Sequence, residues 1–288
     1  MKANYHTHTY YCGHAEGTEE ELVIVAKEKG FEVLGFSEHV PLPWFRWHLI
    51  KAIPISFRSM RSFLSWSKSF VFNGNGFRMA YKYKNKHLKE IDRLKKEYRD
   101  EITLFKGFEC DYLEEYVSYY QKLLESKQVD YLILGNHFYK NSVLLCHYGR
   151  KGLSKTGLKN YTDTSIKALE TKLFRYFAHP DIFMSGYLKW DQHTIDCSYK
   201  ICNVAKDLDI PLELNAGGLR QNKRKINNQL VVSYPYESFW DIVSEVGNKV
   251  IIGLDIHNIE HFDDEIINQL KTFVRRKKLN IIDYIEIK

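Results

Sequence analysis

Short apolar runs recur along the chain, and longer segments with helical spacing of apolar residues separate them. The strand-like runs are Lys2 to Tyr5, Val33 to Phe36, Ile102 to Phe108, Val129 to Gly135, Phe174 to Ala178, Pro211 to Leu214 and Val250 to Leu254. The helix-like segments include Thr18 to Lys29, Asn85 to Arg99, Glu114 to Lys127, Thr194 to Asp207 and Tyr234 to Val246. A strand followed by a helix, repeated in this way, predicts a parallel α/β barrel.

Polar residues follow each of these runs at the point where the predicted strand ends. In chain order they are His6 and His8, His39, Glu109, His137, His179, Asn215, and Asp255 with His257. The carboxyl ends of the strands of a β/α barrel meet at one mouth, so we expect these side chains, together with His14, to lie close together. Imidazole and carboxylate groups suit Zn, Fe or Mn. The pattern predicts a hydrolytic centre that holds more than one metal ion.

The individual motifs differ in how much they indicate. His6 and His8 lie on the same side of an extended chain, although an isolated pair of this kind is often a surface feature. The Glu38-His39 dipeptide by itself could begin a helix. Glu109 ends an apolar strand, where an unpaired charge is costly, so it must be paired or bind a cation. A carboxylate that bridges two metals is the specific form of that expectation. The other five histidines are interpreted as surface groups or as groups behind the ligands: His48, His87, His147, His193 and His261.

The loop after the sixth run reads LNAGGLR and offers a different chemistry. Its glycines permit close backbone approach, and Arg220 could hold phosphate oxygens. The alternative is a glycine-rich loop with a solvated arginine. The sequence contains no GxGxxG fingerprint, P-loop or GxSxG motif.

Composition narrows the class of protein. The 288 residues, 27% of them charged and 15% aromatic, suit a folded protein with one large barrel domain or two ordinary ones. The N-terminus lacks the apolar stretch of a secretory signal, and no run reaches the roughly 20 apolar residues of a membrane span. The five cysteines form no CxxC pair. We therefore expect a cytoplasmic protein with reduced thiols.

One segment, residues 40–89, breaks the alternation of strands and helices. It contains no Asp or Glu, three of the five tryptophans (Trp44, Trp47 and Trp66) and ten basic residues, in a chain whose net charge is only +6. The basic residues are Arg46, Lys51, Arg58, Arg61, Lys68, Arg78, Lys82, Lys84, Lys86 and Lys89. Because the segment begins directly after His39, we expect a lid or insertion over the barrel mouth that attracts anions.

Taken in order, the motifs resemble the PHP (polymerase and histidinol phosphatase) superfamily and, within it, the histidinol-phosphatase-like branch. They are HTH at His6, CGH ending at His14, SEHVPLP from Ser37, GFECDY from Gly107, GNHF at His137, AHPD at His179, LNAGGLR from Leu214, YPYES from Tyr234 and DIH at Asp255. The resemblance covers nearly the whole chain and implies a distorted seven-stranded (β/α)7 TIM-like barrel in a single domain, with a trinuclear site.

The resemblance also implies how the metal ligands divide, and all nine positions carry competent ligands. His6, His8, Glu109 and Asp255 would hold one metal, Glu109, His137 and His179 a second, and His14, His39 and His257 a third.

The sequence thus predicts a metal-dependent phosphoesterase, most specifically a phosphomonoesterase that hydrolyses L-histidinol phosphate with a hydroxide held between two to three Zn, Mn or Fe ions. Glu109, Asp255 and His257 are the expected catalytic residues, with Arg220 as a phosphate clamp and Asp111 orienting a ligand from behind. Two alternatives remain open. One is a phosphodiesterase or nuclease, favoured by the basic aromatic segment. The other is a protein that docks on nucleic acid or a membrane and carries structural metals.

Overall fold

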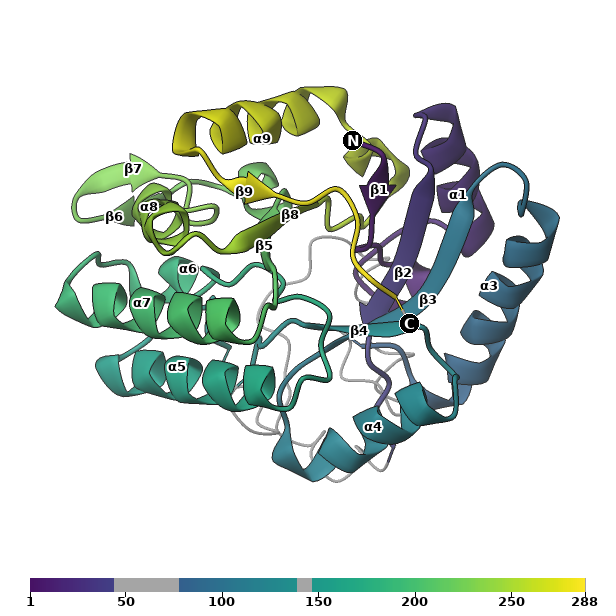
Figure 1. The fold of residues 1–288 in the computed structure, drawn as a ribbon, viewed down its shortest axis with the longest axis horizontal. Helices are drawn as coiled ribbons and strands as arrows, with labels where there is room; N and C mark the ends of the chain where they lie inside the picture. The colour runs from purple at the N-terminus through teal and green to yellow at the C-terminus, as the bar shows by residue number, and fades with distance from the viewer. Residues whose placement is uncertain (44–77, 139–146, 288) are drawn as a thin grey trace.

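A curled parallel sheet forms the centre of the protein. The computed structural model describes residues 1–43, 78–138 and 147–287 (Figure 1). Its first sheet has the order β1-β2-β3-β4, with β1 at Ala3–Asn4, β2 at Val33–His39, β3 at Thr103–Cys110 and β4 at Tyr131–Leu134. Its second sheet has the order β5-β8-β9, with β5 at Leu212–Asn215, β8 at Lys249–Gly253 and β9 at Asn280–Ile281. All neighbouring pairs in both sheets are parallel.

Single bridges connect the two sheets at both sides. Phe177 bridges Leu134 at the end of β4 and Leu212 at the start of β5, and Thr7 bridges Ile256 beyond β8. The predicted run Phe174 to Ala178 therefore occupies its expected place but forms isolated bridges rather than a regular strand. The backbone leaves the sheet at His179, which has a φ of 33° and precedes a proline. The structure is an α/β fold with a curled parallel sheet.

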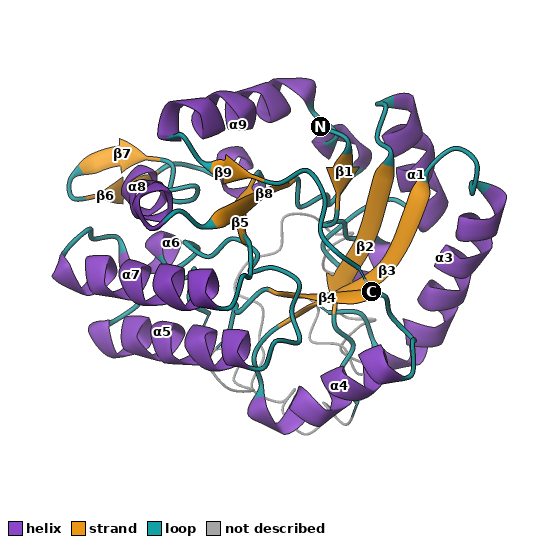
Figure 2. Ribbon diagram, viewed as in Figure 1, coloured by secondary structure: helices purple, strands orange, loops and turns teal. Residues whose placement is uncertain are grey.

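Helices cover the outside of this sheet (Figure 2). They are α1 (Glu19–Glu28), α3 (Lys84–Glu97), α4 (Val117–Glu125), α5 (Lys155–Glu170), the short α6 (Met184–Tyr187), α7 (Gln192–Asp207), α8 (Glu237–Val246) and α9 (Asp264–Lys277). The predicted first residue of a helix is close to the observed one where a capping residue marks the start of the helix. Thr18 and Glu21, for example, form a capping box at the start of α1. Helices α5 and α9 were not among the expected segments.

Shorter elements lie in the connections. They are the 3-10 helices Tyr10–Cys12, Tyr81–Tyr83, Glu114–Tyr116, Gly217–Arg220 and Ile259–His261, and the antiparallel hairpin of β6 (Arg224–Ile226) and β7 (Gln229–Val231). In the described parts of the chain, no helix is both long and apolar enough to cross a membrane. Four cysteines, Cys12, Cys110, Cys197 and Cys202, are buried free thiols.

The end of the sheet where the strands begin is closed by packing. Tyr131 is fully buried there, and its hydroxyl donates to the carbonyl oxygens of Tyr5 (2.7 Å) and Phe36 (3.1 Å). Gly35 leaves the space that this ring occupies, because a Cβ at that position would lie 2.4 Å from the Tyr131 hydroxyl. Ile285 of the C-terminal segment joins the same cluster. The polar strand ends therefore lie at the opposite end.

The predicted basic segment 40–89 falls largely outside the described residues. Five of its basic residues (Arg46, Lys51, Arg58, Arg61 and Lys68) and its three tryptophans lie there, so its role as a lid stays a prediction. The described part differs from that expectation. Residues 84–89 belong to helix α3, and Arg78 is buried in an ion pair with Asp111.

Candidate metal centre

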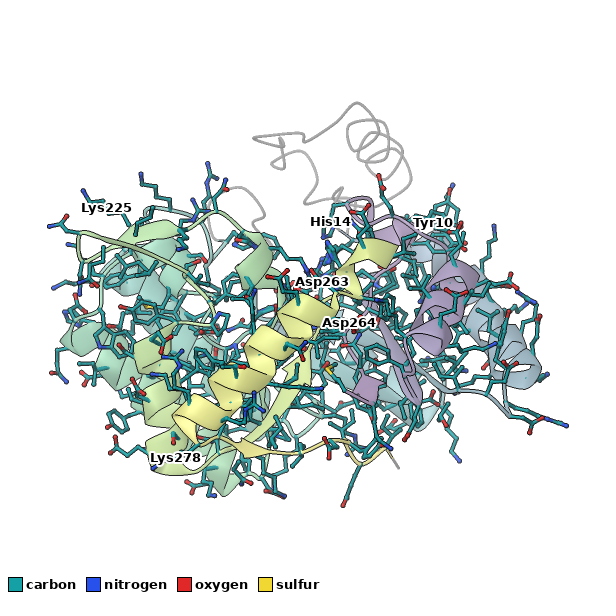
Figure 3. The ribbon with its side chains drawn as sticks, turned by 90° about the horizontal axis from the view of Figure 1, so that it is seen from above. Tyr10, His14, Lys225, Asp263, Asp264 and Lys278 are labelled. Atoms are coloured by element: carbon teal, nitrogen blue, oxygen red, sulfur yellow. The ribbon has the colours of Figure 1, made fainter. Side chains whose placement is uncertain are left out.

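The strand ends bring all nine predicted ligands to one place. They come from the segment after β1 (His6, His8 and His14), from β2 (His39), from β3 (Glu109), from the turns after β4 and Phe177 (His137 and His179), and from the loop after β8 (Asp255 and His257). In Figure 3, His14 lies in the upper part of the view, above Asp263 and Asp264 at the start of α9, whereas Lys278 at the end of α9 lies at the lower left.

His6, His8 and Asp255 form one largely buried group. The Nε2 atoms of His6 and His8 are 3.1 Å apart, and they lie 3.4 and 3.5 Å from Oδ1 of Asp255. Both imidazoles are fully buried. The three donor atoms thus surround a point from which water is largely excluded.

Glu109 lies between this group and the remaining ligands. Its Oε2 atom is 3.6 Å from Nε2 of His6 and 2.9 Å from Nδ1 of His39. Its Oε1 atom is 2.9 Å from Nε2 of His179 and 3.4 Å from Nε2 of His137. One carboxylate therefore contacts two sets of imidazoles, one through each oxygen, as the bridging prediction requires.

A third group forms nearer the solvent. His14, His39 and His257 have donor atoms within 4.8 Å of one another, and the Nε2 atoms of His14 and His257 are 3.0 Å apart. His14 is exposed, whereas His39 and His257 are partly buried. This group is the most accessible from outside.

The electrostatics of the centre favour ionised carboxylates and, at most positions, neutral imidazoles. Burial lowers the pKa of His137 to about 4. Burial acts to raise the pKa of Glu109, but the surrounding imidazoles, His137 first, hold it well below its ordinary value. His6 is the exception. Burial acts to lower its pKa, but the carboxylates around it, Glu213 first, raise it well above the ordinary value.

Pairs of ring nitrogens lie unusually close together in the centre, which is the pattern that a bound cation explains. The close Nε2 pairs, His6 with His8 and His14 with His257, put two ring nitrogens where a shared cation could accept both lone pairs. The donor set therefore fits divalent transition metals.

The backbone at three strand ends adopts the left-handed region that non-glycine residues rarely occupy. Asn136, His179 and Asp255 have φ values of 37°, 33° and 51°. Each residue is, or directly precedes, a candidate ligand. Residues in such strained conformations cluster at functional sites, where the surrounding structure holds them.

Asp111 lies behind His137, where the sequence places an orienting carboxylate. Its Oδ1 atom is 3.3 Å from Nδ1 of His137 and accepts the backbone N–H of that residue at 2.5 Å. Its other oxygen pairs with Arg78, whose Nη1 also donates to the Val40 carbonyl at 3.4 Å. The carboxylate therefore positions both the ring and the backbone of His137.

Arg220 has contacts that differ from those expected of a phosphate clamp. Its Nη1 atom donates to the carbonyl oxygens of Leu254 (2.8 Å) and Asp255 (3.3 Å), and its Nη2 atom donates to that of His261 (3.2 Å). Because these carbonyls belong to the loop that carries Asp255 and His257, the guanidinium braces that loop.

Three further residues were missed or underrated by the sequence reasoning. Glu213 on β5 is fully buried and contacts His6. Its position as an acidic residue inside the apolar run PLELNA was the sequence signal that could have identified it. His147 lies beside His137, with ring centroids 5.8 Å apart, and burial lowers its pKa to about 3. His87 is not a surface group. It is fully buried, and its Nδ1 lies 2.7 Å from Oε1 of Glu19.

The sequence matches a known family and known relatives. A family model for the PHP domain matches residues 4–217. A protein of Deinococcus radiodurans described as "Probable histidinol-phosphatase" is 23% identical over 263 residues, covering 88% of this chain and 85% of that protein. The "Histidinol-phosphatase" of Bacillus subtilis is 30% identical over 150 residues, covering 51% of this chain and 48% of that protein.

The fold also matches a solved structure. The crystal structure of histidinol phosphate phosphatase from Lactococcus lactis, complexed with Zn, L-histidinol and phosphate, has a TM-score of 0.66 and 15% sequence identity. The match covers 98% of this chain and 95% of that chain. At this identity the likeness supports the shared fold.

Proposed function

The chain belongs to the PHP domain family, and from that premise we propose that it is a metal-dependent phosphatase that hydrolyses L-histidinol phosphate to L-histidinol and phosphate. The observation that carries the proposal is the arrangement of Glu109, whose two oxygens face separate sets of imidazoles at the mouth of the sheet. A relative described as a probable histidinol-phosphatase matches 88% of this chain and supports this substrate rather than another ester.

Two to three Zn, Mn or Fe ions are the expected cofactors. His6, His8 and Asp255 would hold one ion together with Glu109, and His14, His39 and His257 would hold another. Glu109, His137 and His179 supply the donors for the remaining position. When bound, such ions polarise phosphoryl oxygens and lower the pKa of water enough for attack at neutral pH.

The protein's own groups prepare the site for a phosphate ester. Glu109 and Asp255 provide anionic ligands, while the low pKa of His137 keeps its lone pair available at neutral pH. Arg220 holds the loop of Asp255 and His257 in place. The exposed His14 marks the side from which an ester would enter.

The diesterase and docking alternatives depend on the basic aromatic segment, most of which lies outside the described residues. Among the described residues, the cluster of imidazoles and carboxylates favours hydrolysis. A purely structural metal site is closed by protein ligands, whereas here the ligand group of His14, His39 and His257 is accessible beside the buried ligands.

A substrate panel tests the proposal. Protein loaded with Zn or with Mn is incubated with L-histidinol phosphate, other amino-alcohol and sugar phosphomonoesters, and a phosphodiester, and released phosphate is measured. We expect the highest kcat/KM for L-histidinol phosphate and no hydrolysis of the diester. Preferential cleavage of the diester would replace the proposal with the diesterase alternative, and no turnover of any ester would refute both.

A further inference from the structure

We propose that Glu213 is a positioning residue that holds ligands of two metal positions at once, and so sets the metal affinity of both. This inference rests on the proposed metal centre. It assigns to a residue outside the nine ligands the control of His6 and His179.

Glu213 is placed for this task by the β5–β8 pair. It lies on β5 with Asn215 two residues later on the same face, and both are buried. On β8, Gly253 is the register partner of Asn215, and a Cβ at this glycine would lie 1.8 Å from Oε1 of Glu213. The glycine therefore leaves the space that the Glu213 carboxylate occupies.

Both carboxylate oxygens act as hydrogen-bond acceptors. Oε2 accepts from the backbone N–H of His179 (3.1 Å) and from Nδ2 of Asn215 (2.7 Å). The amide orientation of Asn215 is fixed because its Oδ1 accepts the N–H of Gly217 at 2.6 Å. Oε1 lies 2.8 Å from Nδ1 of His6. An acceptor at that oxygen keeps a proton on Nδ1 of His6, so the proton that leaves when a metal binds is the one on Nε2.

The consequence for His6 is a fixed tautomer. With its proton on Nδ1, the Nε2 lone pair is directed at Nε2 of His8 and Oδ1 of Asp255, where a metal would bind. The opposite tautomer would put a proton on Nε2 and block that position. Carboxylates behind ligating imidazoles work in this way in metalloproteins, and their loss typically costs about 10- to 100-fold in metal affinity.

For His179, the contact with Glu213 stabilises the backbone conformation. Its φ of 33° is unfavourable for a non-glycine residue, and the hydrogen bond from its N–H to Glu213 helps to keep it there. That backbone conformation directs Nε2 of His179 to within 2.9 Å of Oε1 of Glu109. The third group, His14, His39 and His257, has no hydrogen bond to Glu213 among the described contacts. It should be spared when Glu213 changes.

The test is the substitution Glu213→Gln, read out by metal binding rather than by activity. A glutamine has one acceptor oxygen and one amide donor. It cannot accept from His6 on one side and from the His179 N–H and the Asn215 amide on the other. In Zn- and Mn-buffered competition with a chelator, we expect two of the bound equivalents to weaken by roughly 10- to 100-fold each, while the remaining equivalent keeps its affinity.

Glu19→Gln is the matched control. Glu19 is also a buried glutamate that contacts an imidazole, Nδ1 of His87 at 2.7 Å, but His87 is not a ligand. This variant should bind metal like the parent protein. If E213Q keeps every parental affinity within about twofold, the proposal is wrong. It is also wrong if E19Q and E213Q lose metal to the same extent, because the effect would then reflect general destabilisation.

A second variant covers the case in which E213Q does not fold. Asn215→Ala removes one hydrogen bond from Glu213 and leaves the carboxylate in place, so we expect a smaller, several-fold loss at the same two positions. If E213Q does not fold and N215A binds metal like the parent protein, the proposal is overturned. None of these outcomes depends on the substrate, so a failed phosphatase assay would contradict the proposed function without touching this inference.

Discussion

Gly135 offers a way to disturb the metal centre without removing a ligand. It follows β4 and has a backbone conformation that alanine can adopt, since its φ is not positive. A Cβ at this position would lie 2.5 Å from Oε1 of Glu109 and 2.6 Å from Cε1 of His137. Ordinary contact begins at 3.4 Å, so the Glu109 carboxylate must move by about 0.9 Å and the His137 ring by about 0.8 Å.

Such a movement has little room to be absorbed. Glu109 is also held from its other oxygen by His39 at 2.9 Å, and His137 is held from behind by Asp111. A misplacement of about 1 Å in a catalytic group can cost about 100-fold in rate. We therefore expect Gly135→Ala to lower kcat/KM for L-histidinol phosphate by about 100-fold, with weaker metal retention.

The assay combines phosphate release, metal content and thermal unfolding of the purified variant. Gly157→Ala is the control, because Gly157 lies in α5 and an added Cβ there meets only the flexible side chain of Leu153 and the Ser154 hydroxyl. If G135A retains activity and metal within about twofold of the parent, the geometry around Glu109 does not govern the chemistry, and the reasoning fails.

Three further predictions concern single groups in or beside the centre. Glu109→Gln should lower phosphatase activity by at least about 100-fold and reduce bound metal in elemental analysis, since loss of a mere supporting group already costs 10- to 100-fold; full activity would remove Glu109 from the centre. Arg220→Ala should lower the free energy of unfolding in urea by about 1.5 to 3 kcal/mol and weaken metal binding, because charge-assisted hydrogen bonds to three carbonyls are lost. A change confined to KM for the ester would instead restore the phosphate-clamp interpretation. The metal-free protein should lose stability as the pH falls from about 6.5 toward 4, because the unfolded chain protonates His137 near 6.5 while the folded chain, with a pKa of about 4, does not. The loss for this one group is on the order of 3 kcal/mol, and equal urea midpoints at pH 7 and pH 4.5 would contradict it.

The sequence predicted that the candidate ligands lie together because all but His14 follow an apolar run, and the strand ends of a parallel sheet meet. This logic placed His6, Glu109 and Asp255 together without knowledge of any distance. It also located most strands and helices, since apolar spacing and caps such as Thr18 are local signals. The fifth run was predicted as a strand because composition does not reveal that the backbone turns at His179 after so few paired residues.

What the sequence could not supply was the set of contacts made by polar groups behind the ligands. Arg220 was interpreted as facing a substrate because an arginine after two glycines gives no sign of which carbonyls it will reach. Glu213 was overlooked because an acid inside an apolar run is informative only when its partners, His6 and the His179 N–H, are known. His87 was interpreted as a surface group or a group behind the ligands, although α1 and α3 bury it against Glu19. Such pairings depend on tertiary packing rather than on local pattern.

The most direct test of the account is a titration of the metal-free protein with Zn or Mn, in which bound metal and the rate of phosphate release from L-histidinol phosphate are measured on the same samples. We predict no release without metal and activity that rises to a plateau between two and three bound equivalents, with complete loss on chelation. Phosphate release that is independent of bound metal, or a fully loaded protein that does not hydrolyse the ester, would contradict the proposal that this cluster of histidines and carboxylates is a phosphatase centre.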